Sequence, residues 1–109
     1  MENLICSGNN LLELKVDKCE KLKKLYCSVN KFSDLDLSRN SELIYLECCC
    51  NNLITINLSK NIETFIFEVS SLKKLDISHC PKLEHIDIYG SQITNIDISH
   101  LDKLYYFKA

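Results

Sequence analysis

The sequence predicts a solenoid in which short coils stack to form one parallel β-sheet, and two observations carry this prediction. First, a pattern of apolar residues with one cysteine and one asparagine recurs about every 21 residues throughout the 109 residues. Second, each copy contains a short stretch in which inward apolar residues alternate with outward residues, as in a β-strand. A unit of this length cannot bury its apolar side alone, so neighbouring units must stack.

The units start at residues 1, 22, 43, 62, 83 and 104, and the last is a half-unit. The most regular units place leucine, leucine, cysteine and asparagine at positions 1, 4, 6 and 9, as in Leu22, Leu25, Cys27 and Asn30. The unit that starts at residue 43 is short, which indicates a two-residue deletion near Ile62. Five full repeats and a terminal half-repeat therefore account for a single domain, residues 1–109.

Within each unit, the strand is predicted around positions 4 and 6, whose side chains point inward, with positions 3, 5 and 7 outward. The second half of each unit, such as DLSRN or DISHC, has only about ten residues including its turns. That length is too short for an ordinary helix, so we expect short extended, 3₁₀ or turn segments and very little helix.

The recurring stretch L-x-x-L-x-C-x-x-N-x-L, present as LICSGNNL, LYCSVNKF and LECCCNNL, resembles the leucine-rich repeat family. In particular, it is similar to the bacterial 21-residue, cysteine-containing subclass of the internalin-like proteins. The resemblance implies an α/β-type leucine-rich repeat solenoid, a right-handed coil with a parallel β-sheet on the concave face. The convex face would carry the short extended, 3₁₀ or turn segments.

Two structural ladders are predicted along the coil. Cys6, Cys27 and Cys48 occupy one inward position of successive turns, so they should stack at ~4.8 Å as small buried thiols. Asparagine at the ninth position suits a tight turn, and its amide both donates and accepts hydrogen bonds. The predicted asparagine ladder comprises Asn9, Asn30 and Asn51. The last two full units carry Phe67 and Ile88 instead of cysteine and Ser70 and Ser91 instead of asparagine. Both ladders should therefore be irregular there.

The seven cysteines do not predict a disulfide framework. Cys19 and Cys80 share a position but lie three turns apart, ~15 Å at the spacing of neighbouring strands, beyond the reach of a bridge. The odd number also leaves at least one thiol free. A reduced protein is expected.

The outward positions of the sheet are the candidate binding residues, because the inward ones are committed to the core. Four of the five tyrosines fall there, and tyrosine is enriched where proteins bind partners. The alternative is that tyrosine and isoleucine simply favour strands. The predicted partner-binding residues of the concave face are Ile5, Tyr26, Tyr45, Glu47, Ile66, His85, Asp87, Tyr89 and Tyr106.

No catalytic residues, metal site or cofactor are predicted. Cys49 and His85 both face outward, but strand geometry places them ~16 Å apart, too far for a nucleophile and its base. His85 and Asp87, with Glu68 on the neighbouring strand, could form a charged hydrogen-bonded cluster, but a solvated ion pair is the expected arrangement. The run Cys48–Cys50 lacks the paired spacing of a zinc site. Cys49 is its predicted reactive thiol.

Composition and charge argue against several further classes of function. The formal charge of −2, with 13 basic and 15 acidic residues, argues against nucleic-acid binding. No apolar run approaches the ~20 residues that a membrane span needs. MENLICSGNN lacks the features of a secretory signal, so we expect a cytoplasmic protein if Met1 is the native start. If a signal segment was removed, the protein is secreted or on the cell surface.

The expected function is noncatalytic protein–protein recognition through the concave sheet face, with no enzymatic activity. The alternative is a structural or spacer segment of a bacterial surface adhesin or larger repeat protein. The pattern begins at Met1 and stops within LYYFKA without polar capping units. An unpaired sheet edge invites pairing. Either the chain is a fragment of a longer array, or its ends associate with other copies, or Tyr105 and Tyr106 fold over the end; end-to-end homo-association through the uncapped ends is the further expectation.

Overall fold

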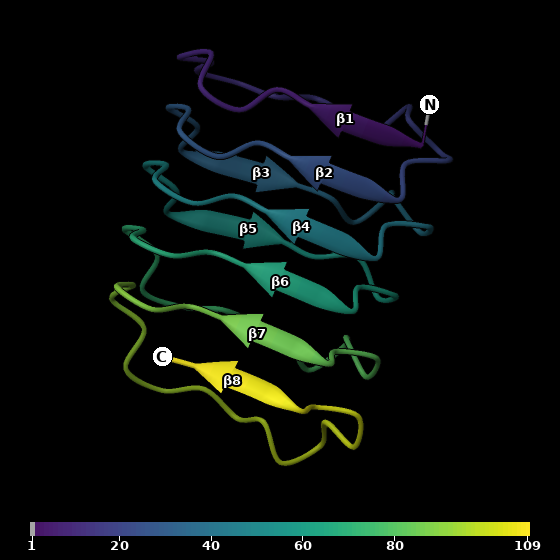
Figure 1. The fold of residues 1–109 in the computed structure, drawn as a ribbon, viewed down its shortest axis with the longest axis vertical. Coiled ribbons are helices and arrows are strands. Elements are labelled where there is room, and N and C mark those ends of the chain that lie inside the picture. The colour runs from purple at the N-terminus through teal and green to yellow at the C-terminus, as the bar shows by residue number, and fades with distance from the viewer. Residues whose placement is uncertain (1) are drawn as a thin grey trace.

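The computed structural model describes residues 2–109 and shows a coil of stacked turns whose strands lie parallel and in register (Figure 1). The main sheet contains, in order, β1 (Asn3–Ile5), β2 (Lys24–Tyr26), β4 (Tyr45–Glu47), β6 (Thr64–Ile66), β7 (His85–Asp87) and β8 (Tyr106–Lys108). A second sheet of β3 (Asp34–Asp36) and β5 (Thr55–Asn57) lies behind it (Figure 1). Residues 2–109 contain no helix. The predicted solenoid of stacked turns, with a parallel β-sheet and very little helix, is confirmed.

The strand register shows how the turns align. Leu25 pairs with Leu4 and with Leu46, 21 residues away on either side, whereas Leu46 pairs with Phe65, 19 residues away. The two missing residues fall between Leu58 and Ile62, which are both buried. The shortened bend also carries a buried serine, Ser59, whose Oγ has no hydrogen-bond partner.

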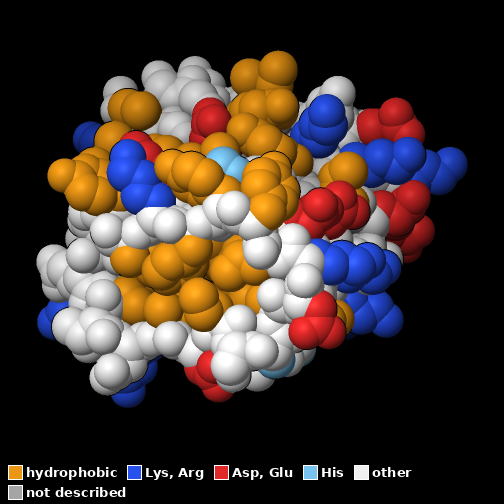
Figure 2. Space-filling model, turned by 60° about the horizontal axis from the view of Figure 1, so that its bottom comes forward, with side chains coloured by type: hydrophobic (Ala, Val, Ile, Leu, Met, Phe, Trp, Pro, Cys, Tyr) orange, Lys and Arg blue, Asp and Glu red, His pale blue; other side chains and the backbone are white. Residues whose placement is uncertain are grey.

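The core fills the space between the two sheets. Side chains at positions 4 and 6 of the central turns are completely buried, and they change from Leu46 and Cys48 to the stacked pair Phe65 and Phe67, whose centroids lie 5.0 Å apart. The first and last turns are less covered. Figure 2 brings the C-terminal end of the coil forward and shows apolar side chains gathered there.

Backbone hydrogen bonds between turns continue past the three-residue strands. At position 6, the Cys27 N–H donates to the Glu47 carbonyl at 2.9 Å, and the equivalent bond recurs in the other full turns. At position 8, the Val29 N–H donates to the Cys49 carbonyl at 2.8 Å, and the Val69 N–H donates to the Tyr89 carbonyl at 2.9 Å. Each turn is therefore tied to the next from the strand to the corner that follows it.

Position 8 has a left-handed backbone in all five full turns. We call these residues the corner row: Gly8, Val29, Cys50, Val69 and Gly90. Their φ angles lie between 53° and 76°, a region that glycine adopts freely and β-branched residues rarely adopt. Val29 and Val69 are therefore strained, and both are more than half exposed. Gly8 and Gly90 show that the fold itself accepts glycine at this corner.

Replacing these valines should stabilise the protein. Val29→Gly and Val69→Gly each relieve the left-handed strain, partly offset by the greater chain entropy of glycine in the unfolded state. We expect each to raise the free energy of unfolding by about 0.5–1 kcal/mol in urea denaturation. Ile54→Gly is the matched control, because this exposed residue is not left-handed and its loss should destabilise. A loss of stability in both valine variants would contradict the strain.

Candidate functional site

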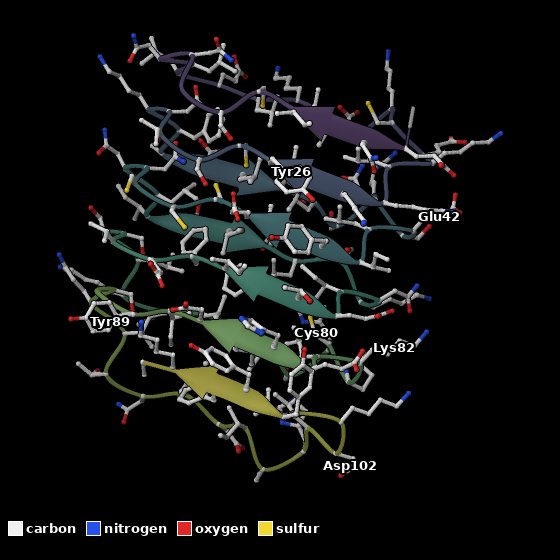
Figure 3. All side chains as sticks on the ribbon, viewed as in Figure 1. Tyr26, Glu42, Cys80, Lys82, Tyr89 and Asp102 are labelled. Atoms are coloured by element: carbon white, nitrogen blue, oxygen red, sulfur yellow. The ribbon has the colours of Figure 1, made fainter. Side chains whose placement is uncertain are left out.

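The outward side chains of the main sheet form one continuous surface, which we call the outer face. Its two rows within the strands follow the strand register. One row contains Asn3, Lys24, Tyr45, Thr64, His85 and Tyr106, and the other contains Ile5, Tyr26, Glu47, Ile66, Asp87 and Lys108. Parallel pairing places the expected binding residues of these strands side by side, and Tyr89 follows β7 at one edge (Figure 3).

Two tyrosines pack together in the N-terminal half of the outer face. The rings of Tyr26 and Tyr45 have centroids 5.1 Å apart and are tilted by 38°. The Tyr45 hydroxyl donates to Glu47 Oε1 at 3.3 Å. Burial, followed by the charge of Glu47, raises the pKa of Tyr45 to about 12. The phenol therefore stays protonated at neutral pH and is held in one orientation.

A second aromatic group lies in the C-terminal half. The His85 ring stacks on Tyr106 with centroids 4.2 Å apart and planes 12° apart, and Tyr105 meets it edge-on. Lys108 Nζ lies 4.7 Å from the centre of the Tyr89 ring, within the range of a cation–π interaction. These contacts order the long side chains of this half.

The acidic residues of this half do not form the expected solvated ion pair. Asp87 is buried, with 7% of its surface exposed, and its Oδ1 accepts a hydrogen bond from the Tyr89 N–H at 3.2 Å. Within residues 2–109 no ion pair joins His85 to Asp87. Glu68 lies 4.0 Å from Lys108, and its pKa is raised, first by a hydrogen bond with Asp87 and then by the charge of that carboxylate. Because the sheet turns Asp87 toward Glu68 and Tyr89, the expectation was wrong.

The asparagine side chains bridge successive turns. Asn30 Nδ2 donates to the carbonyl of Cys6 at 3.0 Å and that of Cys27 at 3.1 Å, and Oδ1 accepts from the Leu11 N–H at 2.9 Å. Asn51 repeats most of this pattern one turn later. In contrast, the hydroxyl of Ser70 accepts only the Leu72 N–H of its own turn, at 3.4 Å. Asn9 bonds within its own exposed turn.

The cysteines are all free thiols. A hydrogen bond with Cys48, followed by burial, raises the pKa of Cys27 well above its ordinary value. Cys49 is half-buried, and burial raises the pKa of its thiol as well. Cys50, in the corner row, is exposed. The accessible thiol of the run is therefore Cys50 and not Cys49, because the corner turns it to solvent.

No group of three potential metal ligands occurs in residues 2–109, and no helix there is long and apolar enough to cross a membrane. His79 Nε2 lies 2.8 Å from the Leu58 carbonyl, and His100 Nε2 lies 3.1 Å from the Ile77 carbonyl. Each imidazole therefore contacts a backbone carbonyl of the preceding turn.

Sequence reasoning missed two features of this region. The corner row was not singled out, although glycine at position 8 of the first and fifth turns was a usable signal for a left-handed backbone. The side of the coil that carries β3 and β5 has a repeated Asp-x-Ser turn, in which Asp36 Oδ1 accepts from both the N–H and the hydroxyl of Ser38. The same turn recurs at Asp76 and Asp97. These hydrogen bonds lower the pKa of all three carboxyls.

The amino-acid sequence matches no family model and no curated protein. Among solved structures, the chain is similar to the functional domain of InlJ from Listeria monocytogenes, which includes a cysteine ladder. The two share 31% sequence identity with a TM-score of 0.91, over 99% of this chain and 24% of the InlJ chain. The chain thus spans about a quarter of the length of that protein.

Removal of one ladder asparagine should weaken the fold strongly. Asn30→Ala leaves the N–H groups of Asn9 and Leu11 without their acceptor and removes one of the two asparagine amides that bond the buried carbonyl of Cys27, and we expect a loss of about 2–3 kcal/mol in the free energy of unfolding. Ser70→Ala removes one long hydrogen bond within a single turn and should cost less than about 1 kcal/mol. Urea denaturation of both variants checks the difference, and equal losses would contradict a bridging role.

Glu68 should make stability depend on pH. Because its folded-state pKa is raised, the folded state binds this proton more tightly than the unfolded chain, so the ionised carboxylate destabilises the fold above that pKa. Glu68→Gln should therefore raise the melting temperature at pH 7, and the gain should shrink as the pH falls toward about 4. Glu42→Gln, at an exposed turn, is the control and should change little. A lower melting temperature for Glu68→Gln at pH 7 would argue against carboxyl repulsion.

Proposed function

We propose that this chain, a leucine-rich repeat solenoid similar to the InlJ domain that includes a cysteine ladder, is a noncatalytic protein-recognition module. The outer face is the proposed binding surface. The observation that carries the proposal is the pre-ordered aromatic surface that extends from the Tyr26–Tyr45 pair to the His85–Tyr106 stack. These rings point away from the core, so the packing of the core does not require them.

The outward tyrosines are held in place by their neighbours, and this favours a role in recognition over the alternative that tyrosine is present only because it favours strands. Binding is opposed by the ordering of long side chains at the interface. Here Tyr45 is already held by Tyr26 and Glu47, and Tyr89 is already paired with Lys108. Tyrosine also combines a large contact area with few rotatable bonds. A partner would therefore meet a surface whose conformational entropy is already low.

The same geometry favours a noncatalytic role. Catalysis by a nucleophile requires a base within hydrogen-bond reach. Cys49 follows β4 and donates its N–H to Ser28 Oγ, whereas His85 begins β7, two strands away, and stacks on Tyr106. The raised pKa of Cys49 also keeps its thiol protonated. We therefore assign these residues to the surface rather than to a reaction.

The second candidate function is a spacer within a larger repeat array. Its support is that the chain corresponds to only 24% of the InlJ chain and that both terminal turns are less buried than the central ones. Self-association through the edges of β1 and β8 belongs with this candidate and stays a prediction. For location, the internalin-like resemblance favours a secreted or surface protein, which protease treatment of intact expressing cells would test.

A double substitution on the outer face tests the recognition proposal. Tyr45→Ala with Tyr89→Ala removes one ring from each half of the face while leaving the completely buried core intact. We expect the circular dichroism spectrum to stay unchanged and the affinity for a partner protein to fall at least tenfold by calorimetry. The partner is first retrieved from lysate of expressing cells with the immobilised chain as bait.

Ile54→Ala is the control, because Ile54 is 66% exposed and precedes β5 of the second sheet, away from the outer face. It should leave the affinity nearly unchanged. If the double variant binds every retrieved protein as tightly as the unmodified chain, the outer face is not the binding surface and the spacer function is favoured.

A further inference from the structure

We propose that Val29, Cys50 and Val69 of the corner row form an apolar ledge that receives aliphatic or aromatic side chains of the same protein partner that binds the outer face. This inference rests on the proposed function and deepens it by naming the chemistry of the contact. The ledge runs along the carboxyl ends of β2, β4 and β6, where each corner follows its strand by three residues.

The first argument is that Val29 and Val69 are strained but gain few compensating contacts within the chain. Val29 and Val69 have φ angles of 55° and 53°, and 56% and 58% of their surfaces are exposed. A β-branched side chain resists this backbone, and exposure means that it gains little by packing within the chain. The same corner is glycine in the first and fifth turns. The three central turns therefore carry side chains that the fold does not need.

The backbone at this corner is held rather than mobile. The N–H groups of Val29, Cys50 and Val69 all donate to carbonyls of the following turn, at 2.8 to 3.1 Å. Gly90 allows Val69 to lie close over the next turn, because a Cβ at Gly90 would stand 3.3 Å from the Val69 nitrogen. The three side chains are consequently displayed in fixed positions on successive turns.

The second argument is the size of the outer face. Six three-residue strands at ~4.8 Å spacing and ~3.3 Å per residue give a projected area of roughly 240 Å². A stable protein interface buries about 800 Å² of accessible surface on each partner, more than three times that footprint. The outer face alone is therefore too small, and a partner must also contact one of the two rims that border it.

The two rims differ in chemistry, and this difference identifies the rim that the partner contacts. The rim at the amino ends of the strands is largely charged and includes the Lys23–Glu2 ion pair at 3.1 Å, together with Glu63 and Glu84. The corner row carries no formal charge and presents two exposed valines and one exposed cysteine. Apolar side chains gain most from burial against the corner row.

The ledge can be tested without the partner by using isobutanol as an aliphatic probe. The full chain, labelled with ¹⁵N and ¹³C-methyl groups, is titrated and followed by nuclear magnetic resonance. We expect the methyl signals of Val29 and Val69 and the amide signal of Cys50 to shift toward saturation. Leu12 and Ile54, exposed by 75% and 66%, are internal controls and should show no saturating shift.

The variant for this test is Val29→Thr with Val69→Thr, because threonine keeps the β-branched shape but is polar. It separates apolar character from backbone strain. Apparent isobutanol affinity at Cys50 should fall at least fivefold, while the urea midpoint stays near that of the unmodified chain. The ledge is overturned if the corner row responds no more than Leu12 and Ile54, or if the threonine variant binds the probe equally well.

With the retrieved partner, the threonine variant separates failure of the ledge from failure of the outer face. We expect its affinity to fall at least tenfold, as for the tyrosine double variant. Full affinity of the threonine variant alongside a loss in the tyrosine variant would overturn the ledge alone. Full affinity of both variants would overturn both assignments.

Discussion

Every feature of this protein depends on one constraint, which is that each turn must satisfy the backbone hydrogen bonds of its neighbour in register. Buried N–H and C=O groups need partners, and a turn of about 21 residues is too short to provide them internally. The ladder from β1 to β8 and its continuation through positions 6 and 8 meet this requirement. Side chains at equivalent positions then stack into rows.

The rows divide the sequence into parts that the fold requires and parts that it leaves free. Inward rows must be apolar, because their side chains lie in direct contact between turns. Asn30 and Asn51 are fixed for a different reason, because their amides reach backbone groups that the ladder leaves open. The outer face and the corner row are the free parts. Their aromatic and strained apolar residues are therefore the informative ones for function.

The two halves of the coil meet the constraint in different ways. The N-terminal half uses small thiols and bridging asparagines, whereas the C-terminal half uses Phe67, Ile88 and serines that bond within their own turns. The change occurs just after the two-residue deletion, where Ser59 is buried with an unpaired hydroxyl. A larger apolar core thus accompanies fewer polar links between turns.

The sequence by itself determined the architecture, because its period fixes the length of a turn and its alternation fixes which side chains enter the core. Leu25, Cys27 and Tyr26 could be assigned to the inside or the outside by counting alone. The tertiary structure decided what depends on neighbours in space. Counting could not show that Asp87 is buried beside Glu68, that Cys50 rather than Cys49 faces solvent, or that Val29 and Val69 occupy a left-handed corner. Those properties arise from contacts and backbone angles between turns, which a one-dimensional pattern does not contain.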